Sequence, residues 1–241
     1  MKPFHFKQFS IQQDQCAMKV TLDACLFGAI CTDSLNNQKN VTTALDIGSG
    51  TGLLSLMLAQ SGVEHITGVE LDKPAAEQAQ ANVLNSPFRN QINIVQKDIN
   101  EYHSDNRFDL ILSNPPFFSN QLKGPSQTRN QARHNDGLSF EALSKVIKHS
   151  LNENGTAWIL LPCDETERFF EYSEKQSLYC HQIIEIKSQK NKTPHRAVFS
   201  LKHDPLIKTS AVLSTITIKN QDLSDYSDEF KTLLKDYYIK L

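Results

Sequence analysis

The chain has 241 residues, of which 39% are hydrophobic and 22% charged, with a formal net charge of -2 at pH 7. This composition is typical of a globular protein with a sizeable core, and it gives no global signature of nucleic-acid binding, so any such surface has to be local. Five cysteines without a C-x-x-C pair indicate neither a disulfide framework nor a zinc site, and no metal is expected.

The N-terminal part of the sequence is expected to be a segment with one helix that packs on the core. Residues 1–7 lack the apolar stretch of a signal peptide, and no run of 18 apolar residues is present, which indicates a cytoplasmic protein without a membrane span. Within residues 19–30, Leu22, Leu26 and Ile30 recur at helical spacing and predict one buried helix face.

The rest of the chain alternates between strand-like and helix-like segments. Residues 1–42 are therefore interpreted as the N-terminal segment and residues 43–241 as the main part of a single domain. Alternation of this kind predicts an α/β protein whose parallel sheet has helices on both faces. The expected strands are 43–47, 65–70, 92–96, 109–113, 156–161, 182–187 and 196–202, and the expected helices are 52–61, 74–85, 139–151 and 226–239.

A glycine-rich loop follows the first of these strands. Gly48, Gly50 and Gly52 allow a tight turn and the close approach of a ligand to the backbone. The spacing is G-x-G-x-G, which differs from the dinucleotide fingerprint G-x-G-x-x-G. Asp46, just before the loop, would repel phosphate and favours a cationic or amino-bearing ligand.

Two further acids stand where a nucleoside would need them. Glu70 ends the next strand, 22 positions after Gly48, where dinucleotide folds place their ribose-binding acid. Asp98 follows the third strand and is suited to accept a hydrogen bond from an adenine amine, with Ile99 packing on the ring. Taken alone, an acid at the position of Asp98 is more typical of a helix cap or a solvated surface acid than of a ligand contact.

The strand at 109–113 ends abruptly in Asn114, Pro115, Pro116 and Phe117. Two prolines stop a strand because they cannot donate to a sheet ladder, so the strand delivers Asn114 to its carboxyl end, where open parallel sheets bind ligands. An amide oxygen, a backbone carbonyl and an aromatic ring together suit a planar group that carries an NH2. For an isolated Asn-Pro-Pro, a simple strand end is equally plausible.

Two local basic stretches are candidate surfaces for phosphates. Residues 175–208 carry seven Lys or Arg against two acids, and residues 188–195 form an expected exposed tip with Lys190 and Lys192. A solvated loop that protects a sheet edge is the alternative interpretation. A second candidate is the loop 123–134, which directly follows the Asn-Pro-Pro-Phe motif.

In this order and at these intervals, the motifs resemble those of the class I methyltransferases that use S-adenosylmethionine, over roughly residues 43–162. The glycine loop matches the first motif of that family, and Asn-Pro-Pro-Phe looks like the signature of members that methylate amino groups. The whole chain is similar to the bacterial tRNA1(Val) adenine-N6 methyltransferases, including residues 4–9, 16–24 and 132–134. Thr21, Leu22, Asp23 and Ala24 depart from the Gly-Thr-Asp-Gly-like stretch of that family.

The resemblance implies a Rossmann-like, seven-stranded, mostly parallel sheet and transfer of a methyl group to the N6 amine of an adenine in tRNA, with position 37 beside the anticodon as the target. The adenine would be single-stranded or flipped out. The implied catalytic residues are Asn114, Pro115, Pro116 and Phe117. The implied S-adenosylmethionine site comprises Asp46, Gly48, Gly50, Gly52, Glu70, Asp98 and Ile99. From local charge and the resemblance together, the candidate contacts to RNA are Lys19, Asp23, Arg129, Arg133, His134, Lys190, Lys192 and Arg196.

Three other functions share parts of this pattern. A guanine-N2 methyltransferase of rRNA and a glutamine-amide methyltransferase of a release factor use a similar motif for planar amines. The latter enzymes usually have Tyr in place of Phe117 and a helical domain before the cofactor loop, whereas only about 45 residues precede the loop here. A non-catalytic RNA-binding module that binds the cofactor is the third alternative.

Overall fold

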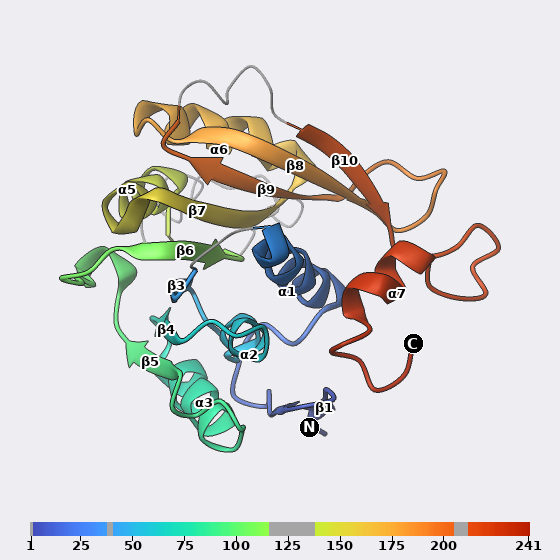
Figure 1. Cartoon of the computed structure of the whole chain (residues 1–241), viewed down its shortest axis with the longest axis horizontal. Helices are drawn as coiled ribbons and strands as arrows, with labels where there is room; N and C mark the ends of the chain where they lie inside the picture. The colour runs from blue at the N-terminus through green and yellow to red at the C-terminus, as the bar shows by residue number, and fades with distance from the viewer. Residues whose placement is uncertain (1, 38–40, 116–137, 205–211) are drawn as a thin grey trace, which may run out of the picture.

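The computed structural model describes residues 2–37, 41–115, 138–204 and 212–241 (Figure 1). The strands of its main sheet are β3 (Thr43–Ile47), β4 (His65–Glu70), β5 (Ile92–Gln96), β6 (Phe108–Ser113), β7 (Leu151–Pro162), β8 (Tyr179–Lys187), β9 (Arg196–Lys202) and β10 (Val212–Thr217). They lie in the order β10-β8-β9-β7-β6-β3-β4-β5. All neighbouring strands are parallel except β9, which runs antiparallel to β7 and β8.

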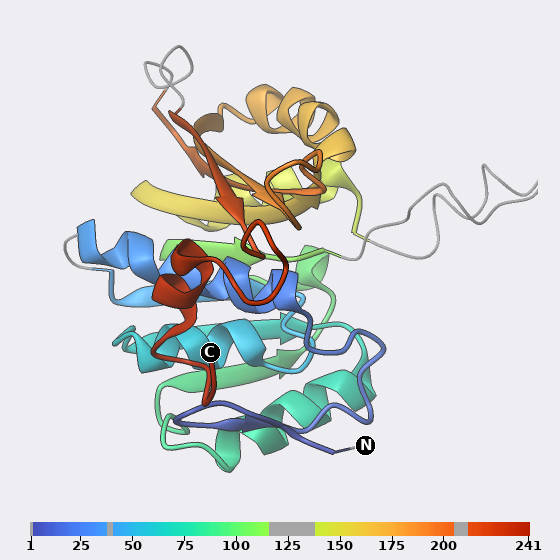
Figure 2. The same cartoon turned by 90° about the vertical axis from the view of Figure 1, so that its right-hand side faces the viewer.

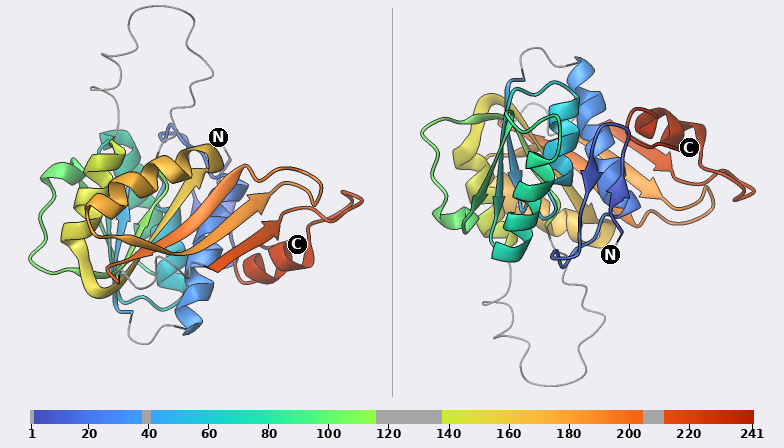
Figure 3. Two further views of the ribbon diagram at one scale, coloured as in Figure 1. Left: turned by 90° about the horizontal axis from the view of Figure 1, so that it is seen from above. Right: turned by 90° about the horizontal axis from the view of Figure 1, so that it is seen from below.

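Helices cover both faces of this sheet, as the views from above and below show (Figure 3). The helices are α1 (Leu22–Ser34), α2 (Leu53–Gln60), α3 (Lys73–Leu84), α5 (Phe140–Ser150), α6 (Cys163–Lys175) and α7 (Asp228–Leu234), with short 3-10 turns η1 (Leu35–Asn37) and η2 (Ile99–Glu101). None of the helices in the described residues has both the length and the hydropathy of a membrane span.

The sheet separates two apolar clusters because successive side chains of a strand point to opposite faces. In β3, Ala44 packs in the cluster of α1 and α2, whereas Leu45 packs in the cluster of α5 and α6. The first cluster also includes Val83 of α3 and Phe230 of α7. Figure 2 shows α1, α2 and α3 one below another along this face.

Side-chain caps explain where several helices begin. The side-chain oxygens of Thr21, Asp72, Ser139 and Ser227 each accept a hydrogen bond from a backbone N–H three residues later. Such a cap satisfies one of the free N–H groups of the first turn and contributes about 1 kcal/mol. Residues 21–24 differ from the Gly-Thr-Asp-Gly-like stretch of the resembling family, but Thr21 still caps the start of α1.

The two ends of the chain are joined on the α1 face. A small hairpin of β1 (Phe4–His5) and β2 (Ser10–Ile11) precedes α1. Between these strands, Lys7 N–H donates to the carbonyl of Tyr237 at 2.8 Å, and the Tyr237 hydroxyl donates to Thr32 of α1 at 2.8 Å. The Phe-rich start of the sequence therefore packs on the body of the protein together with the C-terminal segment.

The expected α/β fold with a mostly parallel sheet is confirmed, but the number of strands was wrong. The described residues contain eight strands in this sheet, because β10 adds to the edge beside β8. The C-terminal helix is also shorter than the expected 226–239 segment, since the capping Ser227 begins it and it ends at Leu234. Helix α6 was not predicted. Only Thr166, Phe169 and Ser173 of this helix are buried, so its buried face is a narrow stripe with a correspondingly narrow apolar signal in the sequence.

Helix α1 differs from its expected amphipathic pattern. Leu22 was expected on the buried face, yet it is 39% exposed because it occupies the first turn of the helix. Residues 24–32 are all buried, since α1 lies between the sheet, α2 and α7. Leu26 and Ile30 are buried as expected.

Candidate active site

Four parallel strands bring the expected site residues to one edge of the sheet. The strands lie in the order β6-β3-β4-β5 and run in the same direction. The glycine loop follows β3, Glu70 ends β4, Asp98 follows β5 and Asn114 follows β6. Open α/β sheets bind ligands at the carboxyl ends of their strands, so this edge, called the ligand edge below, is the candidate site.

The glycine loop, residues 48–52, turns sharply between β3 and α2. Gly48, Gly50 and Gly52 have φ angles of +74°, +52° and +80°, a region that strongly favours glycine. The Gly48 N–H donates to the carbonyl of Val69 at 2.9 Å and fixes the loop to β4. Apart from chain neighbours, no atom of the described residues lies within 4 Å of the position that a Cβ would take at Gly48. A ligand can therefore approach the backbone here.

Glu70 is oriented by two backbone amides. Its Oε2 accepts from Gly50 N–H at 2.8 Å, and its Oε1 accepts from Asp72 N–H at 2.9 Å. A carboxylate has about four acceptor sites, so each oxygen keeps acceptor capacity for a further donor. The side chain is thus held beside the glycine loop in a form that suits a pair of hydroxyl groups.

Asp46 is completely buried beneath the glycine loop. Its Oδ2 accepts from the N–H of Ser55 at 3.1 Å and from the Ser55 hydroxyl at 2.7 Å. Its Oδ1 is buried without a hydrogen-bond partner among the described residues. Burial raises the pKa of Asp46 to about 6, and the nearby charge of Glu70 acts in the same direction. A positively charged ligand would relieve both effects.

Asp98 and Ile99 begin the short turn η2 after β5. One oxygen of Asp98, Oδ1, accepts from the N–H and the side-chain amide of Asn100, both at 2.9 Å. Asp98 therefore caps η2 through Oδ1, as an isolated acid at this position would be expected to do. Its other oxygen, Oδ2, can still accept a hydrogen bond from a ligand. Ile99 is 8% exposed and packs mainly in the cluster of α5 and α6, so only a small part of it can face a ligand.

Asn114 stands at the end of β6, next to the N-terminal segment. Its Nδ2 lies 4.0 Å from the sulfur of Met18, which is 42% exposed. Its Oδ1 is buried and has no donor partner among the described residues. An unpaired buried acceptor costs about 1–3 kcal/mol, so this oxygen favours a ligand that donates an N–H. Pro115 is buried, and Pro116 and Phe117 lie outside the described residues.

Residues 12–20, called the strap below, reach the site, although only Lys19 among them was expected there. The strap runs along α3, where Gln15 N–H donates to the side-chain oxygen of Gln78 at 2.9 Å. Lys19 was expected to bind RNA, but its ammonium donates at 2.6 Å to the carbonyls of Gln13 and Cys16. Two of its three donors therefore close the strap on itself.

Asp23 and Arg196, two other expected RNA contacts, interact with each other. The Nε of Arg196 lies 3.4 Å from one carboxylate oxygen of Asp23, and Nε2 of His195 lies 3.3 Å from the other. These contacts join the first turn of α1 to the start of β9. Arg129, Arg133 and His134 lie outside the described residues.

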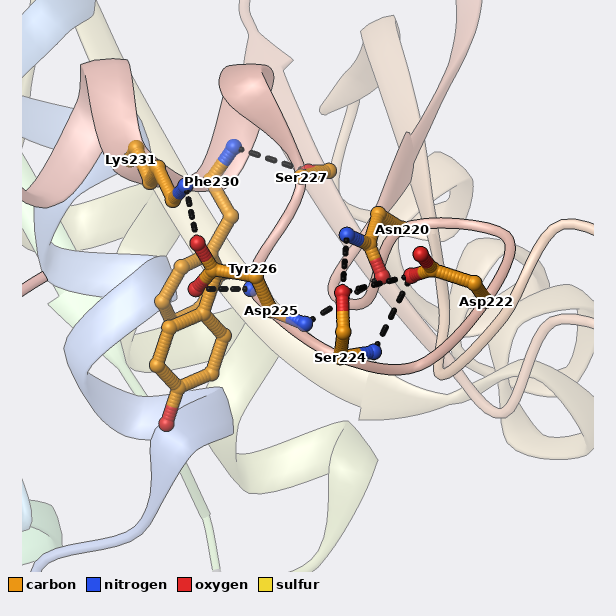
Figure 4. A network of polar contacts seen from close by, with 8 residues as sticks. All are labelled: Asn220, Asp222, Ser224, Asp225, Tyr226, Ser227, Phe230 and Lys231. Atoms are coloured by element: carbon orange, nitrogen blue, oxygen red, sulfur yellow. Dashed lines mark hydrogen bonds and ion pairs between the residues drawn. The ribbon is translucent and has the colours of Figure 1, made fainter.

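The connection between β8 and β9, residues 188–195, forms the expected hairpin tip, and Lys190 and Lys192 on it are exposed. The base of the tip is supported by residues 219–227, called the brace loop below. The Lys219 N–H donates to the carbonyl of Ser188 at 3.1 Å. Within the brace loop and the adjoining α7, a polar network is formed by Asn220, Asp222, Ser224, Asp225, Tyr226, Ser227, Phe230 and Lys231 (Figure 4).

Comparisons with known proteins agree with this geometry. Residues 29–160 match the methyltransferase small domain family. The chain is 38% identical to the tRNA1(Val) (adenine(37)-N6)-methyltransferase of Bacteroides thetaiotaomicron, over 99% of this chain and 98% of the relative. It is also 38% identical to the enzyme of the same name from Pseudoalteromonas translucida, over 100% of both chains.

A solved structure with a similar fold is that of a predicted O-methyltransferase from Agrobacterium tumefaciens. The TM-score is 0.66 at 15% identity, covering 86% of this chain and 95% of the other. At this identity the likeness shows the fold alone.

Proposed function

The chain belongs to the methyltransferase small domain family and, within it, to the tRNA1(Val) (adenine(37)-N6)-methyltransferases, and on that premise we propose that it methylates the N6 amine of an adenine in tRNA. The methyl donor is S-adenosylmethionine. The proposed target is the adenine at position 37, beside the anticodon, which is the nucleotide in the names of the relatives.

The observation that carries the proposal is the buried side-chain oxygen of Asn114 at the ligand edge. An exocyclic amine has two N–H groups and a lone pair that is delocalised into the purine ring, so it is a weak nucleophile. Acceptance of one N–H by Asn114 Oδ1 and of the other by the carbonyl of Pro115 would draw the nitrogen toward tetrahedral geometry. This frees the lone pair and fixes its direction, and positioning of this kind can contribute about 7–11 kcal/mol.

The residues of the glycine loop and the neighbouring strand ends fit the methyl donor. When bound, S-adenosylmethionine supplies an electrophilic methyl group on a positively charged sulfur. We assign the ribose hydroxyls to Glu70 and the adenine amine to Asp98, with a minor apolar contact from Ile99. The open backbone of Gly48, Gly50 and Gly52 and the unpartnered oxygen of Asp46 suit the amino acid part, which carries an ammonium group.

The target base has to leave its stack to reach Asn114, because a stacked or paired adenine cannot present its amine to the end of β6. In the proposed complex, Pro116 stiffens the turn after Asn114 and Phe117 stacks on the base, a contact of about 1–3 kcal/mol. An anticodon loop offers such a base in single-stranded form. The exposed Lys190 and Lys192 of the hairpin tip are the proposed contacts to its phosphates.

Asn114→Ala tests this assignment. It should lower the rate of methyl transfer to tRNA about 100-fold or more, as the loss of a single group that orients or stabilises a transition state commonly does. Cofactor affinity, measured by calorimetry, should stay within about twofold because Asn114 lies beyond the proposed cofactor contacts. Asn106→Ala, at an exposed asparagine before β6, is the matched control. Unchanged turnover in Asn114→Ala would exclude the orienting role.

A further inference from the structure

Asn82 of α3 lies where three segments of the chain meet, one of which is the glycine loop. Its side chain is 2% exposed. Its Oδ1 accepts from Gln12 N–H at 2.9 Å, and its Nδ2 donates to the carbonyls of Gln12 and Thr51, each at 2.9 Å. Both amide hydrogens are used, so a single side chain holds the strap, α3 and the glycine loop together.

Gln78, one turn earlier on α3, holds the strap alone. It accepts from Gln15 N–H at 2.9 Å and donates to the carboxylate of Asp14 at 2.7 Å. Residues four apart lie on the same helix face, so the strap is fixed along α3 at two successive points. Only the contact at Asn82 continues into the glycine loop.

The strap also connects the two halves of the site. From Asn82 it passes Cys16, which is buried. Burial raises the pKa of the Cys16 thiol, and the negative charge of Glu70 raises it further. The strap then reaches Met18, whose sulfur lies 4.0 Å from Nδ2 of Asn114. The strap thus runs from the glycine loop to Asn114, the residue proposed to orient the target amine.

We propose that Asn82 is a positioning residue that couples binding of S-adenosylmethionine to the placement of the strap beside Asn114. It acts through the Thr51 carbonyl, which it holds in the glycine loop, and through the backbone of Gln12. The inference rests on the proposed function only in taking the glycine loop as the cofactor site. Because such coupling is reciprocal, a bound cofactor stabilises the strap as much as the strap stabilises the bound cofactor.

Asn82→Asp is the most direct perturbation. The carboxylate has nearly the same shape as the amide, but it loses both N–H donors and places a negative charge against the carbonyls of Gln12 and Thr51. We expect cofactor affinity, measured by calorimetry, to fall roughly 10- to 100-fold, the usual range for coupling between sites. Asn85→Asp introduces the same charge at an exposed position of the same helix end and should leave the affinity unchanged.

Hydrogen exchange separates coupling from a general loss of structure. In the wild-type protein, S-adenosylmethionine should slow amide exchange in residues 12–20, and this protection should disappear in Asn82→Asp. Gln78→Glu should speed exchange of the strap without affecting that of residues 48–52.

Wild-type affinity in Asn82→Asp, or strap exchange in the wild-type protein that does not respond to the cofactor, would refute the inference. The second measurement needs no variant and stands even if Asn82→Asp fails to fold. The proposed function fails separately, if the wild-type protein binds the cofactor and shows strap protection but methylates no tRNA.

Discussion

Replacement of Asp46 by asparagine should make the cofactor-free protein more stable while weakening its affinity for S-adenosylmethionine. Asp46 is buried, its Oδ1 has no partner among the described residues, and its ionised form is poorly solvated. Asparagine keeps an oxygen that can accept from Ser55 and removes the negative charge. The same change removes the charge proposed to face the ammonium group of the cofactor.

The magnitude follows from the pKa of Asp46. Burial raises it from 3.8 to about 6, and at about 1.36 kcal/mol for each pKa unit this difference corresponds to roughly 3 kcal/mol. A raised pKa means that the folded protein holds the proton more tightly than the unfolded chain does. The contribution of Asp46 to folding is therefore fully present below pH 3.8 and is lost as the pH rises to about 6.

The stability difference between Asp46→Asn and the wild-type protein should accordingly grow from near zero at pH 4 to about 3 kcal/mol at pH 7. Urea unfolding without cofactor over this pH range measures it. Calorimetry at pH 7 should show weaker cofactor binding by the variant. A stability difference that does not change with pH, or a variant that binds the cofactor as tightly as the wild-type protein, would exclude this role of Asp46.

Two further predictions concern other parts of the molecule. Replacement of Lys190 and Lys192 by alanine should weaken tRNA binding and reduce the slope of log affinity against log salt by about two, roughly one for each phosphate contact. Lys145→Ala on α5 is the control. An unchanged slope would place the RNA surface elsewhere. Asp109→Ala should destabilise the protein by about 2–4 kcal/mol, because the carboxylate accepts from Thr42, Thr43 and Asn152. Partial burial of Asp109 opposes these hydrogen bonds, but together they lower the pKa of its carboxyl group. The stabilising effect of Asp109 should therefore be lost as the pH falls below about 4. Equal acid sensitivity of the variant and the wild-type protein in urea unfolding would contradict this.

The sequence predicted the part of the fold where local pattern and tertiary structure agree. The strands 65–70 and 92–96 and the glycine loop were placed correctly, because apolar runs, glycines and helix caps mark their ends. The parallel order of these strands then brings their carboxyl ends together without further information. The position of the candidate site at this edge is therefore a consequence of topology.

The packing of the strap on α3 could not be predicted from the sequence, for a physical reason. Gln78 and Asn82 are polar residues of a helix with a weakly apolar pattern, and from sequence they look like a solvated face. In the structure both are buried, with hydrogen-bond partners 63 and 70 positions away. Burial of a polar side chain depends on which partner reaches it, and the local pattern does not encode that partner.

Long-range pairing within the candidate RNA surface could not be predicted from the sequence either. Asp23 and Arg196 were treated as independent contacts to RNA, whereas they form an ion pair between α1 and β9. Charge content indicated a basic stretch, and its Lys190 and Lys192 are exposed as expected, while its contact with RNA stays a prediction. It could not separate side chains that face solvent from those that join two elements.

Mass spectrometric mapping of the methylated nucleotide shows directly which base the protein modifies. Total tRNA from a strain that lacks the gene should be incubated with the purified protein and S-adenosylmethionine, digested and analysed by position. We expect a single N6-methyladenine at position 37 of tRNA1(Val), and its absence when Asn114→Ala replaces the wild-type protein. Methylation of a guanine or of a protein glutamine instead, or no transfer to tRNA by a protein that binds the cofactor, would contradict it.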